Sequence, residues 1–346
     1  MARGMEVLGN EWVVAGRRLR CGQGQKVTRS ARVVQHGTMR AMTLHPRVIL
    51  LLTLPPLLWA GNAVVGRLMV GQVPPLTLNF LRWLLTLLVL LPLAWRALMP
   101  LSRLRERWPY LLAIGVLGVG AYNSLQYLAL VTSTPINVTL VASSLPVWTL
   151  LIGALCYGVR PSRRELAGGA LGLAGVALVV GRGSWQTLST VRFVPGDLFI
   201  LLAVLGWAVY TWLLARPPAH MQGDRRPPWD WADILLIQTL FGLVGSALFF
   251  GGEQLAGAHP IRWSWGVGAA LLYVSLGASV LAYRSYGLAV AQAGPALASL
   301  FTNLAPLMAA LLSAAVLDET PQPYHAAAFL LIVGGIAISS RKASSA

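Results

Sequence analysis

Long runs of apolar residues alternate with short polar or basic turns over most of this chain. A helix needs roughly 20 mostly apolar residues to cross the hydrocarbon core of a bilayer. The stretches that meet this description lie near 48–67, 76–95, 109–129, 135–157, 164–181, 196–215, 232–251, 263–284, 294–316 and 323–340. The sequence lacks the alternation over about ten residues that a membrane barrel requires. It therefore predicts an all-α integral membrane protein with ten transmembrane helices.

The same pattern occurs twice. Pro135, Pro146 and Pro161 reappear 160 positions later as Pro295, Pro306 and Pro321. Because both copies lie in apolar sequence, this duplication points to two homologous five-helix bundles, a construction common among secondary transporters. We expect a first repeat over residues 47–187 and a second over residues 194–343.

Basic residues predict how the helices are oriented, since Lys and Arg near helix ends are retained on the cytoplasmic side. With the amino terminus inside, the inside turns hold most of these residues. The outside loops hold only Arg67, Arg182, Arg192 and Arg262. Because each repeat has five helices, an odd number, the second repeat has the opposite orientation in the membrane to the first. We expect a multi-pass protein of the plasma membrane, the inner membrane in bacteria, with both termini cytoplasmic.

Composition agrees with a membrane protein, because 56% of residues are hydrophobic, 11% are charged and the mean hydropathy is +0.65. The net charge of +16 does not indicate nucleic acid as a partner, since the basic residues lie in short turns between apolar helices. Expected partners are a small-molecule substrate and membrane lipids, and the oligomeric state is left open.

Residues 1–46 are polar and basic and lack the apolar stretch of a signal peptide. Two interpretations remain open. The segment is a cytoplasmic arm drawn to anionic lipid headgroups, or the start is assigned too early and translation begins at Met39 or Met42. We favour the second.

The sequence contains no arrangement of residues typical of an enzyme active site. The histidines are scattered over loops and helix ends, and Cys21 and Cys156 are far apart. No spacing gathers metal ligands, and no glycine-rich phosphate loop ends in Lys-Ser or Lys-Thr. We therefore expect no catalytic residue, no metal and no cofactor.

Arg82 is the strongest candidate for a residue on the transport pathway, because an ionisable side chain inside the membrane is costly and suggests a function. Its guanidinium could hold a substrate carboxylate or a backbone carbonyl. Alternatively, its long stem reaches the outer headgroups and only anchors the helix. Asn79, three residues earlier, shares its helix face and favours the first interpretation.

Polar and aromatic residues within the helices are further candidates for substrate binding. They are Trp59, Asn62, Tyr122, Asn123, Trp148, Trp207, Tyr210, Tyr283 and Asn303. Pro146 and Pro306 are candidates for gating kinks, since a proline inside a helix removes one backbone hydrogen bond. The alternative is that such side chains only join helices to one another.

Several segments in order resemble the EamA-type drug and metabolite transporters of the ten-helix branch. In the first half they are LLWAGNAVVGRLM, PPLTLNFLRWLL and YLALVTSTPINVTLVASSLPVWTLLIGAL. In the second half they are GDLFILLAVLGWAVYTWLLAR and LGASVLAYRSYGLAVAQAGPALASLFTNLAPLMAALLSAAVLDE. The family's glutamate after the long fourth helix is matched by Glu319, whereas the equivalent position in the first repeat is Val159.

This resemblance implies a secondary transporter that exports small metabolites such as amino acids by alternating access. Exchange of protons for cations is disfavoured, because all eleven Asp and Glu residues lie in loops, near helix ends or in the arm. Two alternatives remain: a flippase for a lipid-linked or phosphate-bearing substrate, and a non-transporting membrane sensor or scaffold.

Overall fold

The computed structural model describes residues 12–14, 17–19, 45–317 and 322–340. The chain divides into two units, Met1–Arg40 and Ala41–Ala346. In the first unit, two short strands, β1 (Trp12–Val14) and β2 (Arg17–Leu19), pair antiparallel. Met39, Met42 and Glu319 lie outside the described residues, as does Pro321.

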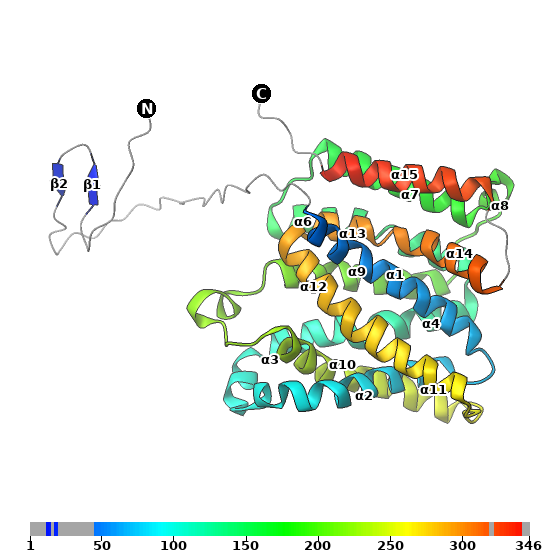
Figure 1. Ribbon diagram of the computed structural model, residues 1–346, viewed down its shortest axis with the longest axis horizontal. Coiled ribbons are helices and arrows are strands. Elements are labelled where there is room, and N and C mark those ends of the chain that lie inside the picture. The colour runs from blue at the N-terminus through cyan, green and yellow to red at the C-terminus, as the bar shows by residue number, and fades with distance from the viewer. Residues whose placement is uncertain (1–11, 15–16, 20–44, 318–321, 341–346) are drawn as a thin grey trace. The chain divides into compact units, whose positions relative to one another are not determined.

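The second unit is helical throughout its described residues (Figure 1). The elements that match the first predicted repeat are α1 (Pro46–Leu68), α2 (Pro75–Ala94), η1 (Trp95–Leu98), α3 (Leu101–Gly115), η2 (Val116–Ala121), α4 (Tyr122–Thr132), α5 (Pro135–Ala142), α6 (Leu145–Tyr157) and α7 (Arg163–Val180). A short helix, α8 (Trp185–Ser189), follows.

The elements that match the second predicted repeat are α9 (Gly196–Ala215), η3 (Ala219–Met221), η4 (Gly223–Arg225), α10 (Trp231–Leu255), α11 (Trp265–Leu272), η5 (Tyr273–Leu281), α12 (Ala282–Ala293), α13 (Pro295–Phe301), α14 (Leu304–Leu317) and α15 (Pro323–Ser340). The third and eighth predicted helices are longer than expected, since they run over 101–132 and 265–293.

Nine helices in the described part of the chain are long and apolar enough to cross a membrane. The remaining predicted stretch is α7, whose first turn carries Arg163, Arg164 and Glu165. An all-α membrane protein is thus confirmed, and the count of ten stays a prediction.

The two halves carry the same irregularities at equivalent positions. The third helix of each half contains a π-helical segment, η2 in one and η5 in the other. The fourth helix of each half is broken, at residues 143–144 between α5 and α6 and at residues 302–303 between α13 and α14. In each break, a hydroxyl bonds back to a carbonyl three residues earlier, from Ser143 to Leu140 and from Thr302 to Ser299.

These breaks lie just before the two prolines that we predicted as kinks. Pro146 stands at the first turn of α6, where its missing N–H is not needed, so it begins a helix instead of bending a continuous one. Pro306 lies in the first turn of α14. The interruption is therefore formed by the preceding polar residues, and a gating role for the prolines stays a prediction.

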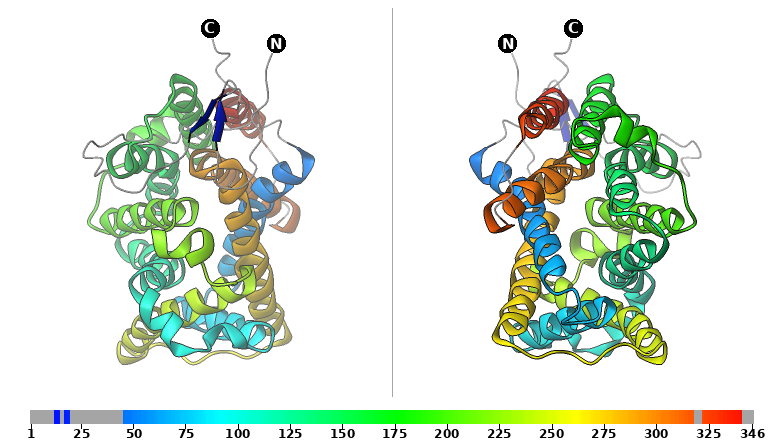
Figure 2. Two further views of the ribbon diagram at one scale, coloured as in Figure 1. Left: turned by 90° about the vertical axis from the view of Figure 1, so that its left-hand side faces the viewer. Right: turned by 90° about the vertical axis from the view of Figure 1, so that its right-hand side faces the viewer.

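The first helix of each repeat packs against the other repeat. Helix α1 packs against α12 and α14 of the second repeat, whereas α9 packs against α4 and α6 of the first. Each repeat's first helix thus contacts equivalent elements of the other. Helices α7 and α15 lie side by side at one edge of the bundle, and α2 packs against α10 at the opposite edge (Figures 1 and 2).

Glycines permit the closest of these contacts. A Cβ atom on Gly168 of α7 would lie 2.6 Å from the carbonyl oxygen of Gly335 in α15, and one on Gly335 would lie 2.7 Å from the carbonyl oxygen of Gly168. These two backbones therefore touch, and a larger residue at either position needs them to move apart.

Candidate solute-binding cavity

A cavity of about 1270 Å³ lies between the two repeats. Its lining includes the exposed residues Arg67, Arg182 and His259 at helix ends and loops, so it reaches the surface there. Trp59 and Arg67 both line it, and eight residues of α1 separate them by roughly 12 Å along the helix axis. Small-molecule sites typically measure roughly 300–1,000 Å³, so this cavity has room for a metabolite together with water.

Arg82 of α2 lies deep in this cavity and is only 3% exposed. Its Nε atom donates to the hydroxyl of Ser279 at 2.6 Å, and its Nη2 atom donates to the carbonyl of Ala278 at 2.9 Å. A longer bond of 3.4 Å joins Nη1 to Oδ1 of Asn62. These partners are a hydroxyl, a carbonyl and an amide, all neutral. A guanidinium has five N–H donors, so donors remain for a solute.

The Arg82 backbone is fixed as firmly as its side chain. The hydroxyls of Thr86 and Ser275 donate to its carbonyl oxygen at 2.8 and 3.1 Å. The guanidinium carbon also lies 4.9 Å from the centroid of the Trp83 ring, a cation–π distance. Arg82 therefore points inward between α2 and η5, and the alternative that it only reaches the headgroups does not fit this geometry.

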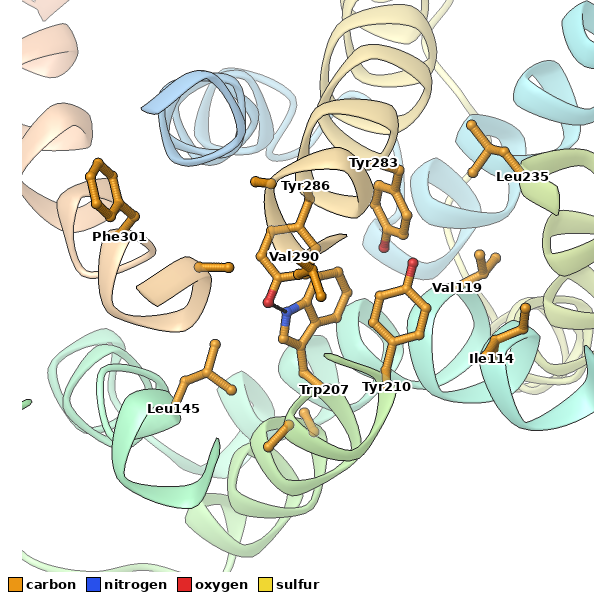
Figure 3. Close-up of a cluster of buried hydrophobic side chains, with 14 of the residues drawn as sticks. Ile114, Val119, Leu145, Trp207, Tyr210, Leu235, Tyr283, Tyr286, Val290 and Phe301 are labelled. Atoms are coloured by element: carbon orange, nitrogen blue, oxygen red, sulfur yellow. Dashed lines mark hydrogen bonds between the residues drawn. The ribbon is translucent and has the colours of Figure 1, made fainter. Parts of the chain in front are cut away.

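Aromatic rings close the deep end of the cavity. Trp59 of α1 and Trp207 of α9 meet edge to face with ring centroids 5.4 Å apart, and the ring of Tyr122 lies 5.3 Å from that of Trp207. The Trp207 Nε1 atom donates to the Tyr286 hydroxyl at 3.2 Å (Figure 3). Trp59, Tyr122 and Trp207 all line the cavity. These three rings, called the aromatic floor below, form an apolar surface that can contact the hydrocarbon part of a solute.

Amide side chains stand around this floor. Asn62, Asn123 and Asn303 line the cavity. Asn303 lies at the break between α13 and α14, and its Nδ2 atom is buried without a hydrogen-bond partner among the described residues. A buried donor without a partner costs free energy, and this one lies beside α7, since a Cβ atom added to Gly172 would be 3.0 Å from it.

Three predicted residues lie outside the cavity lining. Trp148 is half-buried, and its Nε1 atom donates to the Ser144 hydroxyl at 3.1 Å. Tyr210 is buried behind Trp207, with ring centroids 5.0 Å apart (Figure 3). Pro146 is buried in α6. These residues support the floor and the helix break from behind. The others predicted for solute binding, and Pro306, line the cavity.

Other lining residues were not among the predicted site residues. Tyr127 shares a helix face with Asn123, four residues earlier, and this spacing could have identified it. The partners of Arg82, Ala278 and Ser279, are nearly 200 residues away in sequence, and no local pattern pairs them with Arg82. In the described residues, no group of three or more His, Cys, Asp or Glu residues could hold a metal ion.

Two relatives of this chain are named as a transporter and an exporter. The chain is 28% identical over 303 residues to an uncharacterized transporter of Archaeoglobus fulgidus, covering 86% of this chain and 99% of the relative. It is 25% identical over 284 residues to the aromatic amino acid exporter YddG of Ancylobacter novellus, covering 82% of this chain and 93% of the relative. A crystal structure at 24% identity has the same fold, with a TM-score of 0.67 over 84% of this chain and 95% of that chain.

The model of the EamA-like transporter family matches the sequence twice, over residues 46–181 and 194–341. These matches cover most of the chain and include every helix that contributes to the cavity. The chain therefore belongs to the EamA-like transporter family and is a multi-pass membrane transporter.

Proposed function

We propose that this transporter exports a small carboxylate-bearing metabolite, such as an amino acid, across the plasma membrane by alternating access. The observation that carries the proposal is Arg82, a buried guanidinium that lines the cavity and has only neutral partners among the described residues. Charge-assisted hydrogen bonds between guanidinium and carboxylate are among the strongest in proteins.

The aromatic floor supports a solute with an apolar side chain. Trp59, Tyr122 and Trp207 would contact that side chain, while Arg82 and the amides of Asn62, Asn123 and Asn303 hold the polar head. A distant relative is named as an aromatic amino acid exporter, which agrees with a solute that has both a ring and a carboxylate.

Access to the cavity supports the alternating cycle. The cavity reaches the surface at Arg67, Arg182 and His259, which lie at helix ends predicted to be outside. We infer that this conformation is open outward and closed toward the cytoplasm by the aromatic floor. The driving force in this proposal is the solute's own gradient.

Transport in proteoliposomes tests the assignment of Arg82. Arg82→Gln removes the charge, and it should raise the half-saturating concentration of phenylalanine roughly tenfold or more, since a hydrogen bond to a charged group is worth about 1.5–3 kcal/mol. Arg284→Gln makes the same change at an exposed residue that stacks on Trp231 outside the cavity lining, and it should leave the value unchanged. Equal effects of both variants would contradict the assignment.

A further inference from the structure

The π-helical segments of the two repeats occupy equivalent positions. Gly118 lies in η2 and Ala278 lies in η5, and the 160-residue shift that relates the prolines also relates these two residues. π-helical turns are rare and frequently occur at functional sites. Their recurrence at one place in both halves suggests a shared role.

The π-helical turn changes the backbone hydrogen bonding around Ala278. In a regular helix, the N–H of Ala282 would bond to the Ala278 carbonyl. Here that N–H bonds to the carbonyls of Gly277 and Ser279. The Ala278 carbonyl accepts two side-chain donors from the first repeat, Nη2 of Arg82 at 2.9 Å and Nε1 of Trp59 at 3.1 Å.

The equivalent carbonyl in the first repeat has a partner of the same kind. The carbonyl of Gly118 accepts the hydroxyl of Tyr283, which belongs to the second repeat. A Cβ atom on Gly118 would lie 2.7 Å from the Tyr210 ring, so glycine is the residue that fits there. Each π segment therefore holds a side chain that lines the cavity and comes from the other repeat.

Ser279 completes the support of Arg82. Its buried hydroxyl accepts the Nε–H of Arg82 at 2.6 Å and donates to the carbonyl of Val274 at 2.8 Å. Because the hydroxyl proton is used within η5, its oxygen faces the guanidinium as an acceptor. Together with the Ala278 carbonyl, it fixes both the position of the guanidinium and the direction of its plane.

We propose that Ser279 and the Ala278 carbonyl are the positioning groups of the solute site, and that the π segment η5 exists to present them to Arg82. This proposal rests on the proposed function, in which Arg82 binds the solute carboxylate. Ser279 acts through Arg82 and does not touch the solute. Its removal should therefore weaken binding of a solute with a carboxylate while leaving binding of a solute without one unchanged.

Two solutes and one matched variant test this. Phenylalanine carries the carboxylate, and phenylalaninamide replaces it with an amide. Ser279→Ala should raise the half-saturating concentration of phenylalanine roughly threefold or more, because binding must then order a long side chain that Ser279 no longer fixes, and leave that of phenylalaninamide unchanged. Ser285→Ala removes a buried hydroxyl of the adjoining helix α12, outside the cavity lining, and it should change neither value.

Each other outcome contradicts one specific claim. If the wild type transports phenylalanine in preference to its amide but Ser279→Ala behaves as Ser285→Ala does, the proposed function stands and the positioning role is wrong. If the wild type transports neither solute, the amino-acid assignment is wrong and this role with it. Should Ser279→Ala not fold, Ser279→Thr retains the hydroxyl and should keep the wild-type preference for the carboxylate; loss of that preference would overturn the role.

Discussion

At the scale of single residues, the sequence can indicate which side chain has a functional role. It is less able to indicate which residues that side chain contacts. Arg82 is identifiable from the sequence, because a charge deep in an apolar helix needs an explanation. Its partners are not identifiable, since Ala278 and Ser279 belong to another helix almost 200 residues away. The same holds for Trp148, whose indole bonds to Ser144 in the break before its helix instead of lining the cavity.

Asn303 provides a test that separates binding from stability. Its Nδ2 atom is buried without a partner among the described residues, and the residue lines the cavity. Asn303→Ala removes the unpaired donor and adds no bulk beside Gly172, which lies against this amide. We expect thermal unfolding in detergent to occur at an unchanged or higher temperature, because the cost of that donor disappears, while solute affinity falls. A marked loss of thermal stability would indicate that Asn303 is structural.

At the scale of elements, the hydrophobic pattern predicts where most helices lie but not where they are interrupted. The breaks before Pro146 and Pro306 contain hydroxyls that bond to nearby carbonyls, and the π segments accept side chains of the other repeat. Neither interruption changes the apolar character of its helix, so hydropathy does not report it.

Neighbouring glycines on α7 offer a matched pair for testing how closely two elements pack. A Cβ atom on Gly168 would lie 2.6 Å from the Gly335 carbonyl oxygen, whereas one on Gly169 would have no atom within 4 Å. Gly168→Ala should destabilise the protein by about 1–3 kcal/mol through overpacking. Gly169→Ala should be neutral or stabilising, since alanine favours the helix by up to about 1 kcal/mol.

Thermal unfolding of both variants in the same detergent measures the difference. A lower unfolding temperature for Gly169→Ala than for Gly168→Ala would contradict the close contact between α7 and α15.

At the scale of the whole molecule, the recurring prolines predict two repeats, but they do not predict that the first helix of each repeat packs against the other repeat. Helix α1 packs against α12 and α14, while α9 packs against α4 and α6. As a result, the cavity lies between the repeats and is lined by both. Arg82, Trp59 and Tyr283 each bond across this boundary, so a rearrangement of one repeat against the other would change the solute site directly.

The most direct test of this account is uptake of labelled phenylalanine and other amino acids by the purified full chain in proteoliposomes, with and without a pH gradient. We predict saturable uptake of at least one carboxylate-bearing solute that needs no pH gradient and that Arg82→Gln weakens. Uptake only in the presence of the gradient would contradict the proposed driving force. No uptake of any amino acid by protein shown to be folded would contradict the central claim that this cavity carries such solutes.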